Sequence, residues 1–146
     1  MWDSLPTCLT KALLKMSHQV CILWFKNADT TSRNDYHWSL FIAPVNSSNG
    51  VKYDALSSTN SSGDLQWNYS HLPGYEIQQS LNFGDVIMLG SISDVEAFKV
   101  MMLATPLPSN GENCQSWIRK VVQEAVRQGK LPASATAKAK TVPTRP

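Results

Sequence analysis

The sequence predicts an α+β domain in which an antiparallel sheet packs against one amphipathic helix near the C-terminus. The chain has 146 residues, enough for one sizeable core, so we expect a single domain. Short apolar runs bounded by turn residues indicate strands, and the Asn49-Gly50 pair is a strong hairpin signal. Apolar residues recur at three- and four-residue spacing over residues 113–127, which predicts a helix with one buried face.

The order of the elements follows from these patterns. Strands are expected where β-branched and aromatic residues cluster or alternate with polar ones, at residues 19–25, 36–43, 51–57, 65–69 and 85–92. Helices are expected where an N-cap residue precedes a three- and four-residue apolar repeat, at residues 4–16, 93–104 and 113–127.

The second and third predicted strands form a hairpin that brings two polar side chains together. Alternation along residues 36–43 places His37 and Ser39 on one face and their neighbours on the other. If Ile42 faces Val51 across the turn, Asp54 becomes a diagonal neighbour of His37 on the same face. The sequence therefore predicts a carboxylate within reach of an imidazole.

The C-terminal residues are predicted to lie outside the folded domain. Gly129 is a typical helix stop, which ends the last predicted helix. Residues 131–146 are rich in Ala, Thr and Pro and contain a single leucine. We therefore expect one domain over residues 1–130 and a disordered tail over residues 131–146.

Composition and charge exclude several classes of protein. The formal net charge is +2, of which residues 131–146 contribute +3, so the remaining body is close to neutral and offers no basic surface for nucleic acid. The three cysteines are an odd number without a CxxC pair, which argues against a disulfide framework or a zinc site, and we expect no cofactor. The start of the chain lacks the features of a signal peptide, and no apolar run approaches the ~18 residues that span a bilayer. We expect a cytoplasmic protein.

Cys114 lies where the last predicted helix begins. Asn113 is a plausible N-cap, so Cys114 falls in the first turn, on the apolar stripe that Trp117 and Ile118 continue. The positive end of the helix dipole favours a thiolate at this position. Papain-like enzymes use this arrangement, with the cysteine facing a histidine on a sheet. The alternative is a small buried cysteine that fills space between helix and sheet.

A Cys114, His37 and Asp54 triad would satisfy the needs of acyl transfer. His37 would take the thiol proton and later protonate the leaving group, while Asp54 would orient the ring. The Cys114 amide would supply one oxyanion donor, and the second is open among Tyr36, Gln115 and Asn113. Each residue also has a structural alternative, since His37 is flanked by aromatic residues on a strand and Asp54 could be a surface carboxylate.

The motifs resemble the permuted branch of the NlpC/P60 superfamily, which includes the lecithin:retinol acyltransferase-like enzymes. The residues concerned are YHWSLFI at 36–42, VKYD at 51–54 and NCQSWI at 113–118. Residues 19–129 also resemble an uncharacterised fungal domain family with the same HW and NCxxW order. The resemblance implies a papain-like fold, Cys114 as nucleophile and His37 as base. Asp54 stands where these families usually carry a second histidine, and residues 131–146 are polar and basic where the lipid-acting members carry a membrane anchor.

Three functions compete at this point. The leading hypothesis is a cysteine hydrolase or acyltransferase that acts on an amide, ester or thioester of a small-molecule or peptide acyl substrate, through an acyl-Cys114 intermediate. The alternative is a non-catalytic binding module that keeps the papain-like fold, suggested by the aromatic residues Trp38, Trp67 and Trp117. A third hypothesis is a small structural protein whose tail recruits a partner.

Overall fold

The computed structural model describes residues 17–28, 35–78, 80 and 82–145. The five strands are β1 (His18–Ala28), β2 (Tyr36–Pro44), β3 (Asn49–Thr59), β4 (Leu65–Glu76) and β5 (Phe83–Ile92). The three helices are α2 (Val95–Ala104), α3 (Cys114–Arg127) and α4 (Ser134–Ala139). The predicted α+β class is confirmed. The predicted helix over residues 4–16 lies outside the described residues.

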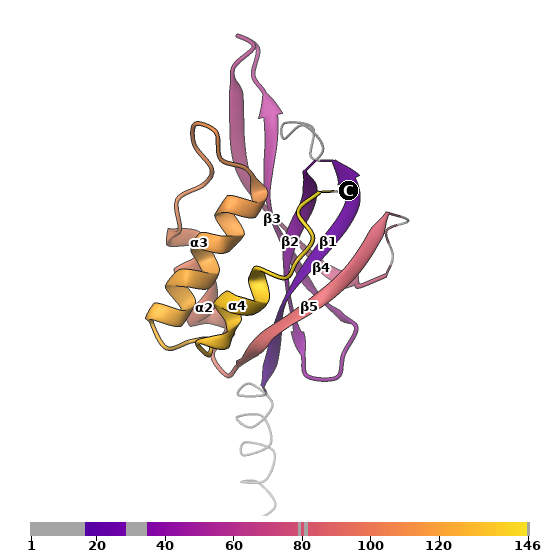
Figure 1. Cartoon of the computed structure of the whole chain (residues 1–146), viewed down its shortest axis with the longest axis vertical. Helices are drawn as coiled ribbons and strands as arrows, with labels where there is room; N and C mark the ends of the chain where they lie inside the picture. Colours follow the sequence, from indigo (N-terminus) through magenta and orange to yellow (C-terminus); the bar gives the residue numbers. More distant parts are fainter. Residues whose placement is uncertain (1–16, 29–34, 79, 81, 146) are drawn as a thin grey trace, which may run out of the picture.

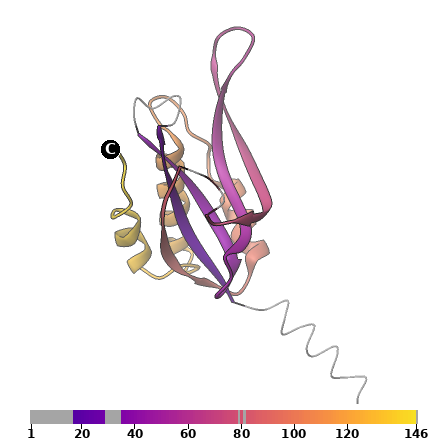
Figure 2. The same cartoon turned by 90° about the vertical axis from the view of Figure 1, so that its right-hand side faces the viewer.

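All five strands form one antiparallel sheet in the order β4-β3-β2-β1-β5. Ile42 pairs with Val51 across β2 and β3, which confirms the predicted hairpin register. The outer ends of β3 and β4 extend beyond the rest of the sheet as a projecting hairpin (Figures 1 and 2). The sheet therefore fixes which side chains of β2 and β3 share a face.

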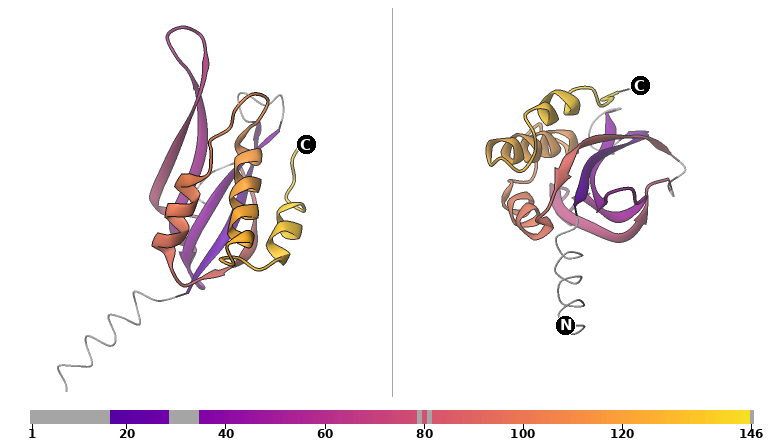
Figure 3. Two further views of the ribbon diagram at one scale, coloured as in Figure 1. Left: turned by 90° about the vertical axis from the view of Figure 1, so that its left-hand side faces the viewer. Right: turned by 90° about the horizontal axis from the view of Figure 1, so that it is seen from below.

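The three helices all lie on one side of the curled sheet (Figure 3). The main core fills the space between them, with Trp38 and Leu40 from β2 packed in one cluster with Trp117 and Ile118 from α3. These four side chains are at most 1% exposed. Apolar side chains at helical spacing on α3 thus meet the alternate positions of β2, as the sequence pattern predicts.

A second, smaller core cluster lies on the opposite face of the sheet. It contains six buried residues from β1, β2 and β4, namely Cys21, Leu23, Phe25, Phe41, Ala43 and Tyr75. Because successive side chains of a strand point to opposite faces, His37 and Ser39 share this face with Phe41. The polar residues of the predicted site thus belong to the face opposite helices α2, α3 and α4.

Three helix boundaries and one strand boundary illustrate the local chemistry. Asn113 caps α3, as predicted, and does so through a capping box with Ser116, while Gly129 adopts a positive φ of 72° after its last turn. The N-cap of α2 is Asp94 rather than the predicted Ser93. Strand β4 continues to Glu76, past the residues that we expected to form a loop, because its pairing with β3 resumes beyond an irregularity.

The prediction of a disordered tail is wrong for residues 131–145. This segment forms α4 and returns to the sheet, and four of its apolar side chains are at most 4% exposed, namely Leu131, Ala135, Ala139 and Val142. Their spacing of four, four and three residues places them on one helical face. The segment is therefore part of the core, and Figure 1 shows it running beside α3 and β5.

Candidate functional site

His37 and Asp54 meet on the face of the sheet opposite helices α2, α3 and α4. His37 Nε2 lies 2.8 Å from Asp54 Oδ1, so the ring nitrogen donates to the carboxylate. The His37 side chain is 19% exposed, whereas the Asp54 side chain is 3% exposed. The predicted contact between this imidazole and this carboxylate is thus present.

Two further side chains, Ser39 and Lys52, complete this cluster around Asp54. Ser39 Oγ donates to Asp54 Oδ1, and Lys52 Nζ forms an ion pair with Asp54 Oδ2. The Lys52 ammonium also lies 5.7 Å from the centroid of the Phe25 ring, which belongs to the second core cluster. Three donors from two strands therefore converge on one buried carboxylate, and we call these four polar residues the Asp54 cluster.

The Asp54 cluster keeps its central carboxylate ionised. Burial by itself raises the pKa of Asp54, but the hydrogen bond from His37 and the positive charge of Lys52 outweigh it, and the pKa lies below its usual value. A buried carboxylate with three donors has little capacity left for a ligand. Ser39 is fully buried and its hydroxyl donates to Asp54, so this hydroxyl is not accessible to a substrate.

The structure does not bring Cys114 to the His37–Asp54 pair. Helix α3, which Cys114 begins, packs on the face of the sheet that carries Trp38 and Leu40. The His37 ring points to the other face, where it lies 5.9 Å from the Phe25 ring. Alternation along β2 gives the helix-facing position to Trp38 and the opposite one to His37, so the His37 ring and helix α3 lie on different faces of the sheet.

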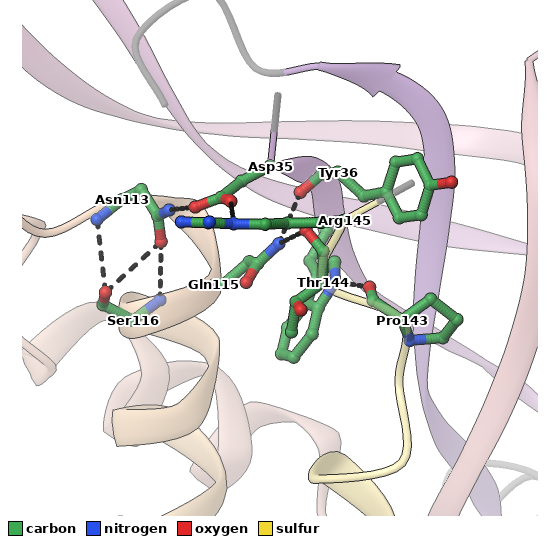
Figure 4. A network of polar contacts seen from close by, with 9 residues as sticks. Asp35, Tyr36, Asn113, Gln115, Ser116, Pro143, Thr144 and Arg145 are labelled. Carbon is green, nitrogen blue, oxygen red and sulfur yellow. Dashed lines mark hydrogen bonds and ion pairs between the residues drawn. The ribbon is translucent and has the colours of Figure 1, made fainter. Parts of the chain in front are cut away.

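Cys114 itself is fully buried at the start of α3. Its neighbour Asn113 accepts hydrogen bonds from the Ser116 backbone and side chain and donates through Nδ2 to Asp35 Oδ2, at 3.0 Å (Figure 4). Asp35 immediately precedes β2 and also forms an ion pair with Arg145. The N-terminus of α3, the start of β2 and the C-terminal segment thus meet at one place.

At this junction, one carbonyl oxygen receives two N–H donors. The Tyr36 backbone N–H and the Gln115 side-chain amide both donate to Thr144 O, at 2.8 and 3.0 Å (Figure 4). The same amide nitrogen donates to Tyr36 O at 2.8 Å, and Trp38 Nε1 donates to Pro143 O at 2.9 Å. Gln115 and Tyr36, which we expected as oxyanion donors, therefore bind a main-chain carbonyl of this chain.

Trp117 has a structural role in the core. It is 1% exposed, and its ring packs edge-on against Tyr69 with 6.2 Å between the centroids. Within the described residues its indole N–H has no hydrogen-bond partner. Trp117, one of the aromatic residues that suggested a binding module, therefore belongs to the core and offers little surface to a ligand.

Sequence reasoning missed four of the residues that build these two sites, although each had a signal. Ser39 faces Asp54 when the predicted register is extended, and Lys52 shares the Asp54 face by alternation. Asp35 and Arg145 were overlooked because the tail was expected to be disordered. The repeat of small apolar residues between residues 131 and 142 was the signal for its packing.

The described surface has other hollows, which do not coincide with these residues. One of about 540 Å³ lies between α2 and α3, and one of about 390 Å³ lies beside the end of β5. Neither is lined by a predicted site residue. No three His, Cys, Asp or Glu side chains gather in metal-binding proximity in the described part of the chain. Its helices also include none with the length and apolar character needed to cross a membrane.

The fold and these two polar sites define a small α+β domain with an antiparallel sheet covered by helices on one face. The chain belongs to the family described as "Family of unknown function (DUF6914)", whose model matches residues 18–144. This match includes the C-terminal segment as far as Thr144. No curated protein and no solved structure matches the chain.

Proposed function

We propose that this chain is a non-catalytic binding module, and the observation that carries the proposal is the separation of Cys114 from His37. A thiol nucleophile needs a base within hydrogen-bond reach and access to substrate. Cys114 is fully buried on the helix side of the sheet, while His37 lies on the other side. The His37–Asp54 pair is engaged in the Asp54 cluster, where it stabilises a buried charge.

The proposal includes a fold derived from the permuted NlpC/P60 type. The order of an HW strand, a following strand and a later helix that begins with an Asn-Cys pair supports this relationship. A packed antiparallel sheet with this helix against it also supports it. The direction of the His37 side chain, away from helix α3, is the observation that favours a non-catalytic member of this fold type.

Alkylation by iodoacetamide tests the non-catalytic proposal. Modification of Cys114 and Cys21 is mapped by mass spectrometry over a range of pH, in folded and in urea-denatured protein. We expect Cys114 to stay unmodified near neutral pH until the chain unfolds, because its side chain is fully buried. Rapid modification at neutral pH that slows in a His37→Ala variant would refute the proposal and favour a thiol enzyme.

A cysteine hydrolase or acyltransferase is the second candidate, and one observation favours it. Two N–H donors converge on the Thr144 carbonyl beside the first turn of α3, which is the donor geometry of an oxyanion hole. In this reaction the Cys114 thiolate would bond to the acyl carbon, the leaving group would depart with a proton, and water would release the acid. The test is an acyl-ester assay on a chain that ends at Val142, with Cys114→Ala as the control.

A further inference from the structure

Residues 143–145 lie across the junction of α3 and β2 and contact four residues of the folded body. These residues are Asp35, Tyr36, Trp38 and Gln115, which we call the cradle. Figure 4 shows the segment entering from α4, with its carbonyl groups directed at the cradle and its arginine directed at Asp35. The cradle thus holds two consecutive carbonyls and one cation.

Main-chain hydrogen bonds and one ion pair hold this last part of the chain. The buried apolar contacts of the C-terminal segment end at Val142, which is 2% exposed. Beyond it, Pro143 and Thr144 are half-buried, and the Arg145 side chain is 68% exposed. Main-chain carbonyl contacts are independent of side-chain identity, and an exposed ion pair is weak. A segment bound in this way can be exchanged for another of similar chemistry.

The cradle favours an occupant, because the Trp38 indole N–H and the Tyr36 backbone N–H lose their acceptors when residues 143–145 leave. Trp38 is fully buried and its indole N–H reaches outward to Pro143 O. A buried donor without an acceptor costs about 1–3 kcal/mol. The Tyr36 N–H and the Gln115 amide share the Thr144 carbonyl in the same way. Loss of the C-terminal residues would therefore favour the entry of another chain that carries carbonyl groups at the same spacing.

We infer that the cradle is a peptide-binding site, which residues 143–145 occupy in cis. Its ligand class is an extended peptide with two consecutive carbonyl groups followed by a basic side chain, since these are the features that Trp38, Gln115 and Asp35 contact. This inference rests on the proposed binding function and names the site and the ligand. Attachment to the same chain makes residues 143–145 a competitor of any such peptide.

The strength of this competition follows from the covalent connection of residues 143–145 to the rest of the chain. A short linker presents its ligand at an effective concentration in the millimolar range. If the segment has an intrinsic Kd on the order of 100 μM, a free peptide binds the intact chain about tenfold more weakly than an open cradle. A change that weakens the segment in cis should therefore strengthen binding in trans.

Fluorescence anisotropy with a labelled peptide of residues 141–146, Thr-Val-Pro-Thr-Arg-Pro, measures this competition. The proteins are the full chain, an Arg145→Glu variant and a Lys140→Glu variant, which is the matched charge reversal at an exposed position outside the cradle. We expect the peptide to bind Arg145→Glu severalfold more tightly than the full chain and Lys140→Glu, because the reversed charge replaces the ion pair with Asp35 by repulsion. A second peptide with glutamate in place of its arginine should bind each protein at least fivefold more weakly.

A chain that ends at Val142 provides the second variant, and its folding is checked by circular dichroism. It should bind the peptide at least as tightly as Arg145→Glu, and an added Asp35→Asn substitution should reverse that gain. Equal affinity of the full chain, Arg145→Glu and Lys140→Glu for the peptide would overturn the inference. Equal binding of the two peptides, with arginine and with glutamate, would also overturn it. If the truncated chain does not fold, the inference is tested by the peptide affinity of Arg145→Glu compared with that of the full chain and of Lys140→Glu.

The outcomes separate this inference from the proposed function. Absence of peptide binding together with an unreactive Cys114 would refute the peptide site and leave the non-catalytic module. Tight binding together with cleavage of the peptide, or with rapid alkylation of Cys114 in the truncated chain, would support the site and refute the non-catalytic proposal.

Discussion

Replacement of Asp54 by alanine should destabilise the fold substantially, because it removes the only acid of the Asp54 cluster. Breaking a buried ion pair by removing one partner costs about 3–5 kcal/mol, mostly because the other charge stays buried. Here the His37 and Lys52 side chains are 19% and 17% exposed, so water can reach both after the substitution. We therefore expect a loss at the lower end, about 2–3 kcal/mol in the free energy of unfolding at pH 7.

Urea denaturation followed by tryptophan fluorescence measures this loss. With a dependence of 1–3 kcal/mol per molar urea, the midpoint should fall by roughly 1–2 M. An Asp64→Ala variant is the control, because Asp64 is exposed at the turn between β3 and β4. Its midpoint should change little. A loss below about 1 kcal/mol for Asp54→Ala would refute the role of the cluster in stability.

The Asp54→Ala variant also tests how the stability of the fold depends on pH. The pKa of Asp54 is lowered by folding, because the hydrogen bond from His37 and the charge of Lys52 outweigh the effect of burial. Its contribution is therefore fully present above the unfolded value, about 3.9, and is lost as the pH falls through the lower folded pKa. The difference between wild type and Asp54→Ala should stay constant from pH 7 to pH 5 and shrink below about pH 4. A difference that is the same at every pH would contradict this assignment of charge.

Three other experiments test how side chains pack on the two faces of the sheet. Burial raises the pKa of Cys21 to about 11, so iodoacetamide at pH 8 should label Cys21 only in denatured protein, as measured by intact mass. Trp117→Phe should change the free energy of unfolding by about 1 kcal/mol or less, since it removes a buried N–H that lacks a partner in the described residues. Trp38→Phe should lower the free energy of unfolding by about 1–2 kcal/mol more, because it removes the N–H that donates to Pro143 O. Thermal melts measure both variants. Gly50→Ala should cost about 3 kcal/mol or more in urea denaturation, because an added Cβ would lie 2.4 Å from Ile42 O.

Local patterns were sufficient to predict the central part of the fold. The hairpin signal, the alternation along β2 and the helical repeat of α3 each depend on neighbours in sequence, and the structure confirms the Ile42–Val51 register and the Asn113 cap. The contact between His37 and Asp54 followed from that register. Sequence pattern therefore determined which polar side chains share a face of the sheet.

The position of α3 relative to the two faces could not be predicted in this way. Alternation shows that His37 and Trp38 point in opposite directions, but both faces of β2 are apolar enough to bury a helix. The outcome depends on the summed packing of Trp38, Leu40 and Trp117 in one core, which is a property of the whole chain. The tail was misjudged because small residues such as Ala135 contribute little hydrophobicity individually, yet pack closely against neighbouring elements.

The difference between the two polar sites decides which of them can serve a function. In the Asp54 cluster every donor and acceptor comes from strands β2 and β3, so the cluster cannot open without unfolding the sheet. In the cradle, the acceptors come from the C-terminal segment, whose last fully buried apolar side chain among the described residues is Val142. Low local stability is what a binding surface needs, because a ligand must displace what is already there. The first site therefore stabilises the domain, and the second is the one at which a partner can exchange with the chain.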